Sequence, residues 1–165
     1  MGKRLPEVIN EEEFFKILKE TKKEKHKLAF GLAFFCGLRI SEVCKLQQED
    51  IDLNRNMLFV RQSKGGKDRY VPIPPPLRTK LKGVPISLTP RCLELALHRI
   101  SKKVLGKGTR FHSLRHSAAT LYLSRGMNIR EVQQLLGHSR LDTTGIYTKA
   151  NPEESIKMVW EKINE

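Results

Sequence analysis

Hydrophobic positions recur at helical spacing through most of the chain, in segments bounded by glycine, proline and capping residues. Asn10 followed by three glutamates predicts a helix start, because carboxylates are stabilised at the positive end of the helix dipole. A second helix is predicted over about 27–36 and ends at Gly37. Since this second helix is apolar nearly all round, we expect it at the centre of the core.

The spacing changes to strand-like runs in the middle of the chain. Residues 57–62 and 69–73 are rich in β-forming side chains and flank the segment 63–68, which contains paired glycines. This arrangement predicts a β-hairpin, and Pro72 marks its second strand as an edge strand, because proline has no backbone N–H to donate to a neighbour. A short helix at about 41–46 precedes the hairpin.

Helical spacing returns in the second half of the chain. The helices expected there lie at about 77–82, 90–103, 112–125 and 129–136, with a short one after residue 142 and a tail helix over 151–165. One side of the tail helix is apolar, which predicts that it is buried against its own domain or a neighbouring copy. The whole pattern predicts a mainly α fold with a small antiparallel β-hairpin or sheet (α+β), in a single domain over 1–165.

The charge balance narrows the class of partner. The 165 residues include 31 Lys and Arg against 18 Asp and Glu, a formal net charge of +13, which favours a polyanion and nucleic acid first. No apolar run approaches the roughly 18 residues of a membrane span, so no membrane partner is expected. The three cysteines show no C-x-x-C spacing, which indicates a reduced, cytoplasmic protein without a cysteine-built metal site.

Several residues occupy positions where a structural role and a chemical role are both open. Arg39 lies at a seam between two apolar segments, where it either pairs with Glu42 or meets an external anion. His112 and Arg115 are three residues apart at a helix start, so they share a face near the positive end of the dipole. The other candidates are Lys64 at the hairpin tip, His138 after a helix-ending glycine and Tyr147 in a polar segment.

Together these side chains suit chemistry at a phosphodiester. Two guanidiniums clamp a phosphate, histidines donate to its oxygens or move protons, and a lysine protonates a leaving oxygen. A tyrosine hydroxyl attacks phosphorus once its proton is removed. The chain lacks the carboxylate cluster of two-metal nucleases and the G-x-x-x-x-G-K-[ST] phosphate loop, so we expect neither a metal nor another cofactor.

Five sequence boxes, in order, resemble the catalytic domain of the tyrosine recombinases, the phage-integrase family, with the Xer-type enzymes the most similar in style. The boxes are Gly37-Leu38-Arg39-Ile40-Ser41-Glu42, Lys64 on the hairpin, His112-Ser113-Leu114-Arg115-His116, Leu135-Leu136-Gly137-His138 and Thr143-Thr144-Gly145-Ile146-Tyr147. The similarity extends over about 5–160. It implies double-stranded DNA as the partner and self-association, as a tetramer on paired sites, in the full-length context.

The resemblance also implies a role for each candidate. Tyr147 would form a 3′-phosphotyrosyl link, and Lys64 would act as general acid toward the leaving 5′-oxygen, with neither metal nor ATP. The other catalytic residues implied are Arg39 and Arg115 as the phosphate clamp, with His112 and His138 for proton transfer and oxyanion binding. Lys67 is an alternative to Lys64, and both Lys67 and Arg69 are expected to contact DNA.

The resemblance also sets an expectation for the domain organisation. Members of this family usually carry a helical DNA-clamping domain before the catalytic one, and we expect that domain to be absent from this chain, since about ten residues precede the first helix.

Two alternative functions stay open. A type IB topoisomerase shares the same chemistry but relaxes a single duplex. A DNA-binding module without cleavage predicts binding and no covalent adduct.

Overall fold

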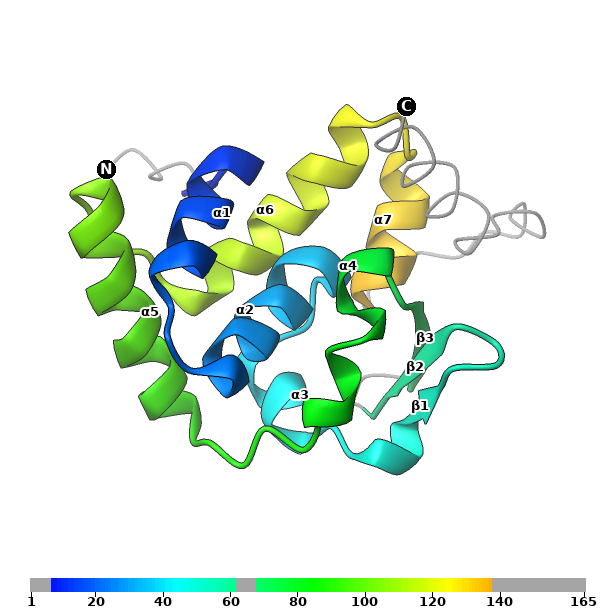
Figure 1. Ribbon diagram of the computed structural model, residues 1–165. Helices are drawn as coiled ribbons and strands as arrows, with labels where there is room; N and C mark the ends of the chain where they lie inside the picture. The colour runs from blue at the N-terminus through cyan, green and yellow to red at the C-terminus, as the bar shows by residue number, and fades with distance from the viewer. Residues whose placement is uncertain (1–6, 62–67, 138–165) are drawn as a thin grey trace.

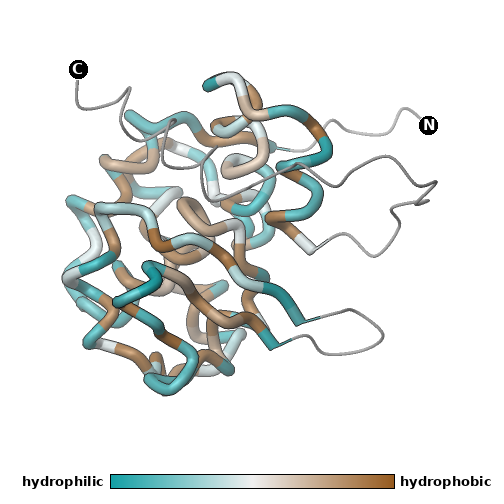
Figure 2. The backbone as a smooth tube through the Cα atoms, turned by 90° about the vertical axis from the view of Figure 1, so that its right-hand side faces the viewer, coloured by the Kyte–Doolittle hydropathy of each residue, from teal (hydrophilic) through white to brown (hydrophobic). Residues whose placement is uncertain are grey.

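Helix α2 (Glu24–Cys36) runs through the middle of the fold (Figure 1), and every one of its residues in 28–36 is buried. The computed structural model describes residues 7–61 and 68–137. The most extensive contact of α2 is with α6 (Phe111–Ser124), and α3 (Ile40–Lys45), α4 (Pro75–Arg78) and α5 (Pro90–Leu105) also pack against it. Hydrophobic positions gather along these inner segments (Figure 2). The expectation of a central apolar helix is confirmed.

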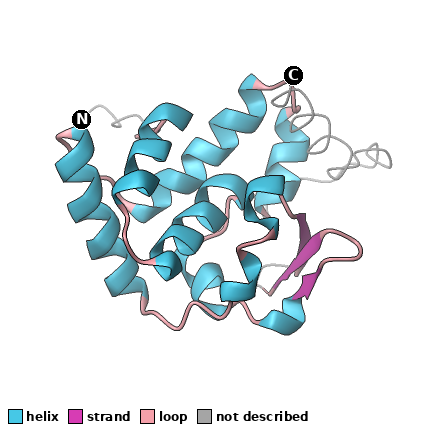
Figure 3. Ribbon diagram, viewed as in Figure 1, coloured by secondary structure: helices cyan, strands magenta, loops and turns pink. Residues whose placement is uncertain are grey.

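Three strands and four further helical segments complete the described part of the chain. They are α1 (Glu11–Glu20), the 3-10 turns η1 (Gln48–Asp50) and η2 (Leu81–Gly83), α7 (Ile129–Leu136), β1 (Ile51–Asp52), β2 (Met57–Val60) and β3 (Arg69–Pro72). Helices dominate, and the strands lie together at one side of the molecule (Figure 3). The expected mainly α fold with a small antiparallel sheet is therefore confirmed. The helices expected after residue 142 and over 151–165 lie outside the described residues.

The sheet has the order β1-β2-β3 with antiparallel neighbours. Met57 lies opposite Pro72 and Val60 opposite Arg69, so β2 and β3 pair as the sequence predicts and β3 forms an edge. The two-residue strand β1 was not expected, because so short a segment carries no alternating pattern. The helix expected at 77–82 is instead two short pieces, α4 and η2, because the chain there makes i→i−3 bonds such as Lys80 N–H to the Leu77 carbonyl.

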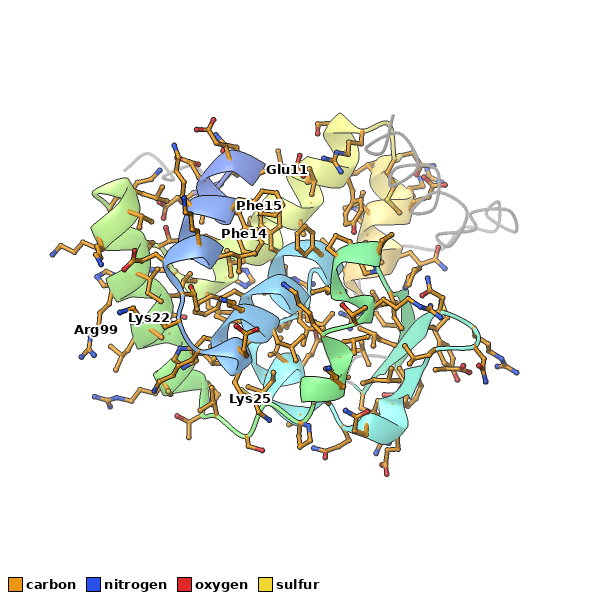
Figure 4. All side chains as sticks on the ribbon, viewed as in Figure 1. Glu11, Phe14, Phe15, Lys22, Lys25 and Arg99 are labelled. Atoms are coloured by element: carbon orange, nitrogen blue, oxygen red, sulfur yellow. The ribbon has the colours of Figure 1, made fainter. Side chains whose placement is uncertain are left out.

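Helix α1 is fixed at its start by a capping box and along its length by aromatic packing. The side chain of Asn10 accepts from the Glu13 N–H, and the Glu13 carboxylate accepts from the Asn10 N–H. Phe14 then stacks on Phe34 of α2 with ring centroids 3.9 Å apart, whereas Lys22 projects from the surface (Figure 4). The start of α1 is where the sequence predicts it, but α2 begins at Glu24, earlier than expected.

Two expectations from composition can be compared with the described residues. All three cysteines are free, with Cys36 buried and Cys44 and Cys92 partly buried. Over the two described ranges, every helix is too short or too polar to cross a bilayer.

Gly37 is the tightest backbone position at the centre of the fold. It ends α2 in the left-handed region, with φ +66°. A Cβ built on it would lie 2.3 Å from Cδ2 of Leu136, a side chain buried at the end of α7. A glycine is thus required both by the backbone conformation and by the close approach of α7 to the end of α2.

This position yields a stability prediction with an internal control. Gly37→Ala should lower the free energy of unfolding by at least about 2 kcal/mol, because strain at positive φ adds to overpacking against Leu136. Gly106→Ala should cost only about 1 kcal/mol, because Gly106 has φ +72° but nothing within 4 Å of the place a Cβ would occupy. Urea denaturation of both variants measures the difference, and equal losses would contradict the close approach.

Candidate active site

Arg115 lies at the centre of the candidate site and ties three helices together. It belongs to α6 and is 4% exposed. Its Nη1 donates to the Gly37 carbonyl at 2.7 Å, and its Nη2 donates to the Leu136 carbonyl at 2.6 Å. The guanidinium therefore joins the end of α2 and the end of α7 to α6, and both acceptors are carbonyls that a helix terminus leaves without an intrahelical partner.

Arg39 begins α3 and shares the site with Glu42, three residues further on. The Arg39 backbone N–H donates to Oε2 of Glu42 at 2.8 Å, and its Nη1 donates to Oε1 at 3.2 Å. The side chain of Arg39 is 40% exposed, whereas that of Glu42 is 3% exposed. The pairing of Arg39 with Glu42 is therefore confirmed, and because the guanidinium is also partly exposed, its contact with an external anion stays a prediction.

Arg69 approaches the same carboxylate from the sheet. Its Nη1 and Nη2 donate to the two oxygens of Glu42 at 2.9 and 3.0 Å, and its Nε donates to the Leu135 carbonyl at 2.9 Å. The side chain is 8% exposed. All three guanidinium nitrogens therefore donate to protein acceptors, and the expected contact of Arg69 with DNA stays a prediction.

The electrostatics of the cluster are those of an anion site. Burial disfavours the charged form of Glu42, but the hydrogen bonds and charge of Arg69, with the Arg39 N–H, outweigh it and hold the pKa of Glu42 below its usual range. Burial, reinforced by the charges of Arg39 and Arg69 and opposed by Glu42, lowers the pKa of Arg115 to about 10. The guanidiniums of Arg39, Arg69 and Arg115, which we call the arginine cluster, thus lie around the single carboxylate of Glu42. They leave an excess of positive charge that a phosphate would neutralise.

His112 stands next to these arginines near the start of α6. Burial, followed by the charges of His116, Arg115 and Arg39, lowers the pKa of His112, which favours the neutral imidazole. Its ring lies edge-on to that of His116, with centroids 4.5 Å apart. The helix start itself already holds an anion, because the Phe111 N–H donates to the Glu94 carboxylate at 3.1 Å.

The structure brings together three of the six catalytic candidates. Arg39, at the start of α3, lies near His112 and Arg115 of α6, since the charges of both arginines act on His112; the catalytic roles of the three stay predictions. The candidates that lie outside the described residues are Lys64, Lys67, His138 and Tyr147. Where the chain is described, no group of three or more His, Cys, Asp or Glu side chains is placed to hold a metal ion.

Two features of the cluster escape the sequence interpretation. Glu42 enters it only as an alternative partner for Arg39, although its spacing of three from a helix-starting residue is the mark of a capping box. The pairing of Glu42 with Arg69 joins residues 27 positions apart. No local sequence pattern predicts such a contact, because it depends on how the sheet packs against α3.

The fold and the arginine cluster together define the class of the tyrosine recombinase catalytic domains. The chain belongs to the phage integrase family, whose pattern it matches over residues 7–84 and 82–154. The tyrosine recombinase XerA of Pyrococcus furiosus is 38% identical in an alignment that covers 98% of this chain and 63% of that protein. The chain thus spans about three fifths of the length of this relative.

Solved structures show the same fold. The integrase of mycobacterium phage Brujita superposes with a TM-score of 0.80 at 21% identity, over 96% of this chain and 60% of that one. A lambda integrase tetramer bound to a Holliday junction superposes with a TM-score of 0.68 at 23% identity, over 90% of this chain and 52% of that one. These similarities confirm the expected fold class.

The arginine cluster predicts how the histidines titrate. A sulfate bound beside Arg39 and Arg115 should offset their charge and stabilise the imidazolium, so it should raise the depressed pKa of His112. The pKa of His26, which is lowered by burial and Lys23, should not move. Nuclear magnetic resonance titrations in sodium sulfate and in sodium chloride of equal ionic strength measure both. An equal response of the two histidines would mean that no anion binds at the cluster.

Proposed function

We propose that this chain is the catalytic domain of a site-specific DNA recombinase, which cleaves and rejoins strands through a 3′-phosphotyrosyl intermediate without metal or ATP. The observation that carries the proposal is the convergence of Arg39 and Arg115 with His112 at an electropositive site. Guanidiniums held in place before the reaction stabilise the charge that develops on a phosphate in the transition state. Membership of the phage integrase family supports the same chemistry.

The proposed reaction exchanges one ester for another at phosphorus. The Tyr147 hydroxyl oxygen attacks, its proton passes to a histidine, His112 or His138, and the bond from phosphorus to the 5′-oxygen breaks. Lys64 gives its proton to that leaving oxygen. Because the phosphotyrosyl ester conserves the bond, a 5′-hydroxyl from the same or a second duplex reverses the reaction without an external energy source.

The proposed partners follow from charge and similarity. Double-stranded DNA suits the net charge of +13, and the lambda integrase that shares this fold is a tetramer on a Holliday junction. We therefore propose that the protein acts as a tetramer on paired DNA sites when it is combined with the further segments that its longer relatives contain. A cytoplasmic location, where three free cysteines stay reduced, is part of the same proposal.

A pool of nicked duplexes with randomised sequence around the nick tests the function and the alternatives. Cleavage near the nick releases a short 5′-hydroxyl fragment, so the covalent intermediate accumulates and survives denaturing capture. Sequencing of the captured DNA then identifies the target. A recombinase exchanges strands between two captured duplexes, a type IB topoisomerase relaxes a supercoiled plasmid as a monomer, and a binding module yields no adduct.

Substitution of the proposed nucleophile separates chemistry from binding. Tyr147→Phe removes one oxygen and leaves the net charge unchanged, so DNA binding should persist while adduct formation falls by at least about 10³-fold. Tyr70→Phe is the matched control, because Tyr70 is 59% exposed on β3 and should form the adduct normally. An adduct formed by Tyr147→Phe would assign the nucleophile to another residue.

The proposed general acid is tested by changing the leaving atom. Lys64→Ala should slow cleavage about 10²–10⁴-fold, the usual contribution of a positioned general acid. Replacing the leaving 5′-oxygen by sulfur, which departs without a proton, should restore the rate of Lys64→Ala and not that of Tyr147→Phe. Lys67→Ala is the comparison in single-turnover cleavage: rescue of Lys67→Ala instead would transfer the role to Lys67.

A further inference from the structure

All three nitrogens of the Arg69 guanidinium donate to protein acceptors, two of them to Glu42 and one to the Leu135 carbonyl. Its guanidinium forms a two-bond fork on Glu42, and both side chains are nearly inaccessible. Geometry of this kind fixes two groups relative to each other more firmly than a lysine does, because both N–H bonds must be aligned. What Arg69 does for the site must therefore pass through Glu42 and through the Leu135 carbonyl.

Each oxygen of Glu42 is shared between Arg69 and Arg39. Oε1 accepts from Nη1 of Arg69 at 2.9 Å and from Nη1 of Arg39 at 3.2 Å. Oε2 accepts from Nη2 of Arg69 at 3.0 Å and from the Arg39 backbone N–H at 2.8 Å. Arg69 thus supplies the stronger side-chain pairing, and the side chain of Arg39 makes one longer bond while remaining 40% exposed.

A buried carboxylate needs a cation, and this requirement sets the state of Arg39. With Arg69 in place, the charge of Glu42 is neutralised from the interior and Arg39 keeps its charge for an anion on the outside. Without Arg69, the next available cation for Glu42 is Arg39, because an unpaired buried charge is far more costly than a paired one. Arg39 would then turn fully onto Glu42 and lose affinity for phosphate.

Arg69 also holds one of two neighbouring carbonyls at the end of α7. Its Nε binds the Leu135 carbonyl, and Nη2 of Arg115 binds the Leu136 carbonyl. Both arginines therefore anchor the end of α7, one from the sheet and the other from α6. The position of Arg115 relative to Arg39 depends on this shared attachment.

We propose that Arg69 is a positioning residue of the anion site, which keeps Arg39 available to a bound phosphate by neutralising Glu42 from the interior and anchoring α7. The proposal rests on the proposed function, since the phosphate in question is that of the DNA backbone. It assigns no contact between Arg69 and DNA.

Sulfate affinity tests the proposal in the full chain, with the His112 imidazole resonances as the readout at constant ionic strength. Arg69→Met should weaken sulfate binding about tenfold, because Arg39 is diverted to Glu42. Arg69→Lys keeps the charge and loses the two-bond fork, so its sulfate affinity should lie between those of the wild type and Arg69→Met. Arg55→Met is the matched control: it removes an equal charge from the turn between β1 and β2, where Arg55 is 80% exposed and pairs with the partly exposed Asp52, and should change affinity by less than about twofold.

A second substitution distinguishes positioning from a purely structural role. Adding Glu42→Gln to Arg69→Met removes the carboxylate that competes for Arg39, so sulfate affinity should return to within about threefold of the wild-type value. A merely structural Arg69 would lower the melting temperature of both variants and show no such recovery. Unchanged affinity in Arg69→Met, or no recovery in the double variant, overturns the proposal.

Two further outcomes are also decisive. If Arg69→Met does not fold, wild-type affinity in Arg69→Lys overturns the proposal and reduced affinity supports it. If sulfate does not shift His112 even in the wild-type chain, the proposed function loses its anion site. Hydrogen exchange at the Arg39 guanidinium still decides the role of Arg69: it should slow in Arg69→Lys or Arg69→Met, and an unchanged rate would overturn the proposal.

Discussion

The ionised carboxylate of Glu42, buried between Arg39 and Arg69, is the interaction on which the arrangement of the site depends. Burial alone would favour its neutral form, and only the surrounding donors keep the charge in place. Those donors come from the start of α3 and from β3. The carboxylate therefore stays ionised only where α3 and β3 pack together, and this packing sets the direction of the partly exposed guanidinium of Arg39.

Arg115 is in the opposite electrostatic situation to Glu42, because it is a buried cation close to two other cations. Burial, Arg39 and Arg69 all disfavour its charge, and Glu42 with two helix-end carbonyls compensates in part. Perturbed pKa values of this kind concentrate at functional sites. An anion between Arg39 and Arg115, as the proposed function requires, would reduce this repulsion.

The sequence predicts those features whose cause is local. The helix start at Asn10, the central place of the apolar helix α2 and the glycine that ends α2 each depend on neighbouring residues, and each is predicted correctly. The sequence boxes also single out Arg39, His112 and Arg115, whose catalytic roles stay predictions. The orientation of Arg69 is not predicted by the sequence. Strand alternation leaves open which face of the hairpin packs against the body of the protein. A single step of that alternation separates the largely buried Arg69 from the exposed Tyr70.

The same alternation gives the two faces of β3 different surroundings. Successive side chains of β3 point to opposite faces, so Arg69 reaches Glu42 while Tyr70 lies against Phe59 on the outer face, with ring centroids 5.1 Å apart. The strand is thereby attached to the arginine cluster at one residue and left accessible at the next. Any rearrangement of the hairpin that changes its register by one residue would withdraw Arg69 from Glu42. The register of two short strands and the charge state of the site are consequently coupled through a single buried ion pair.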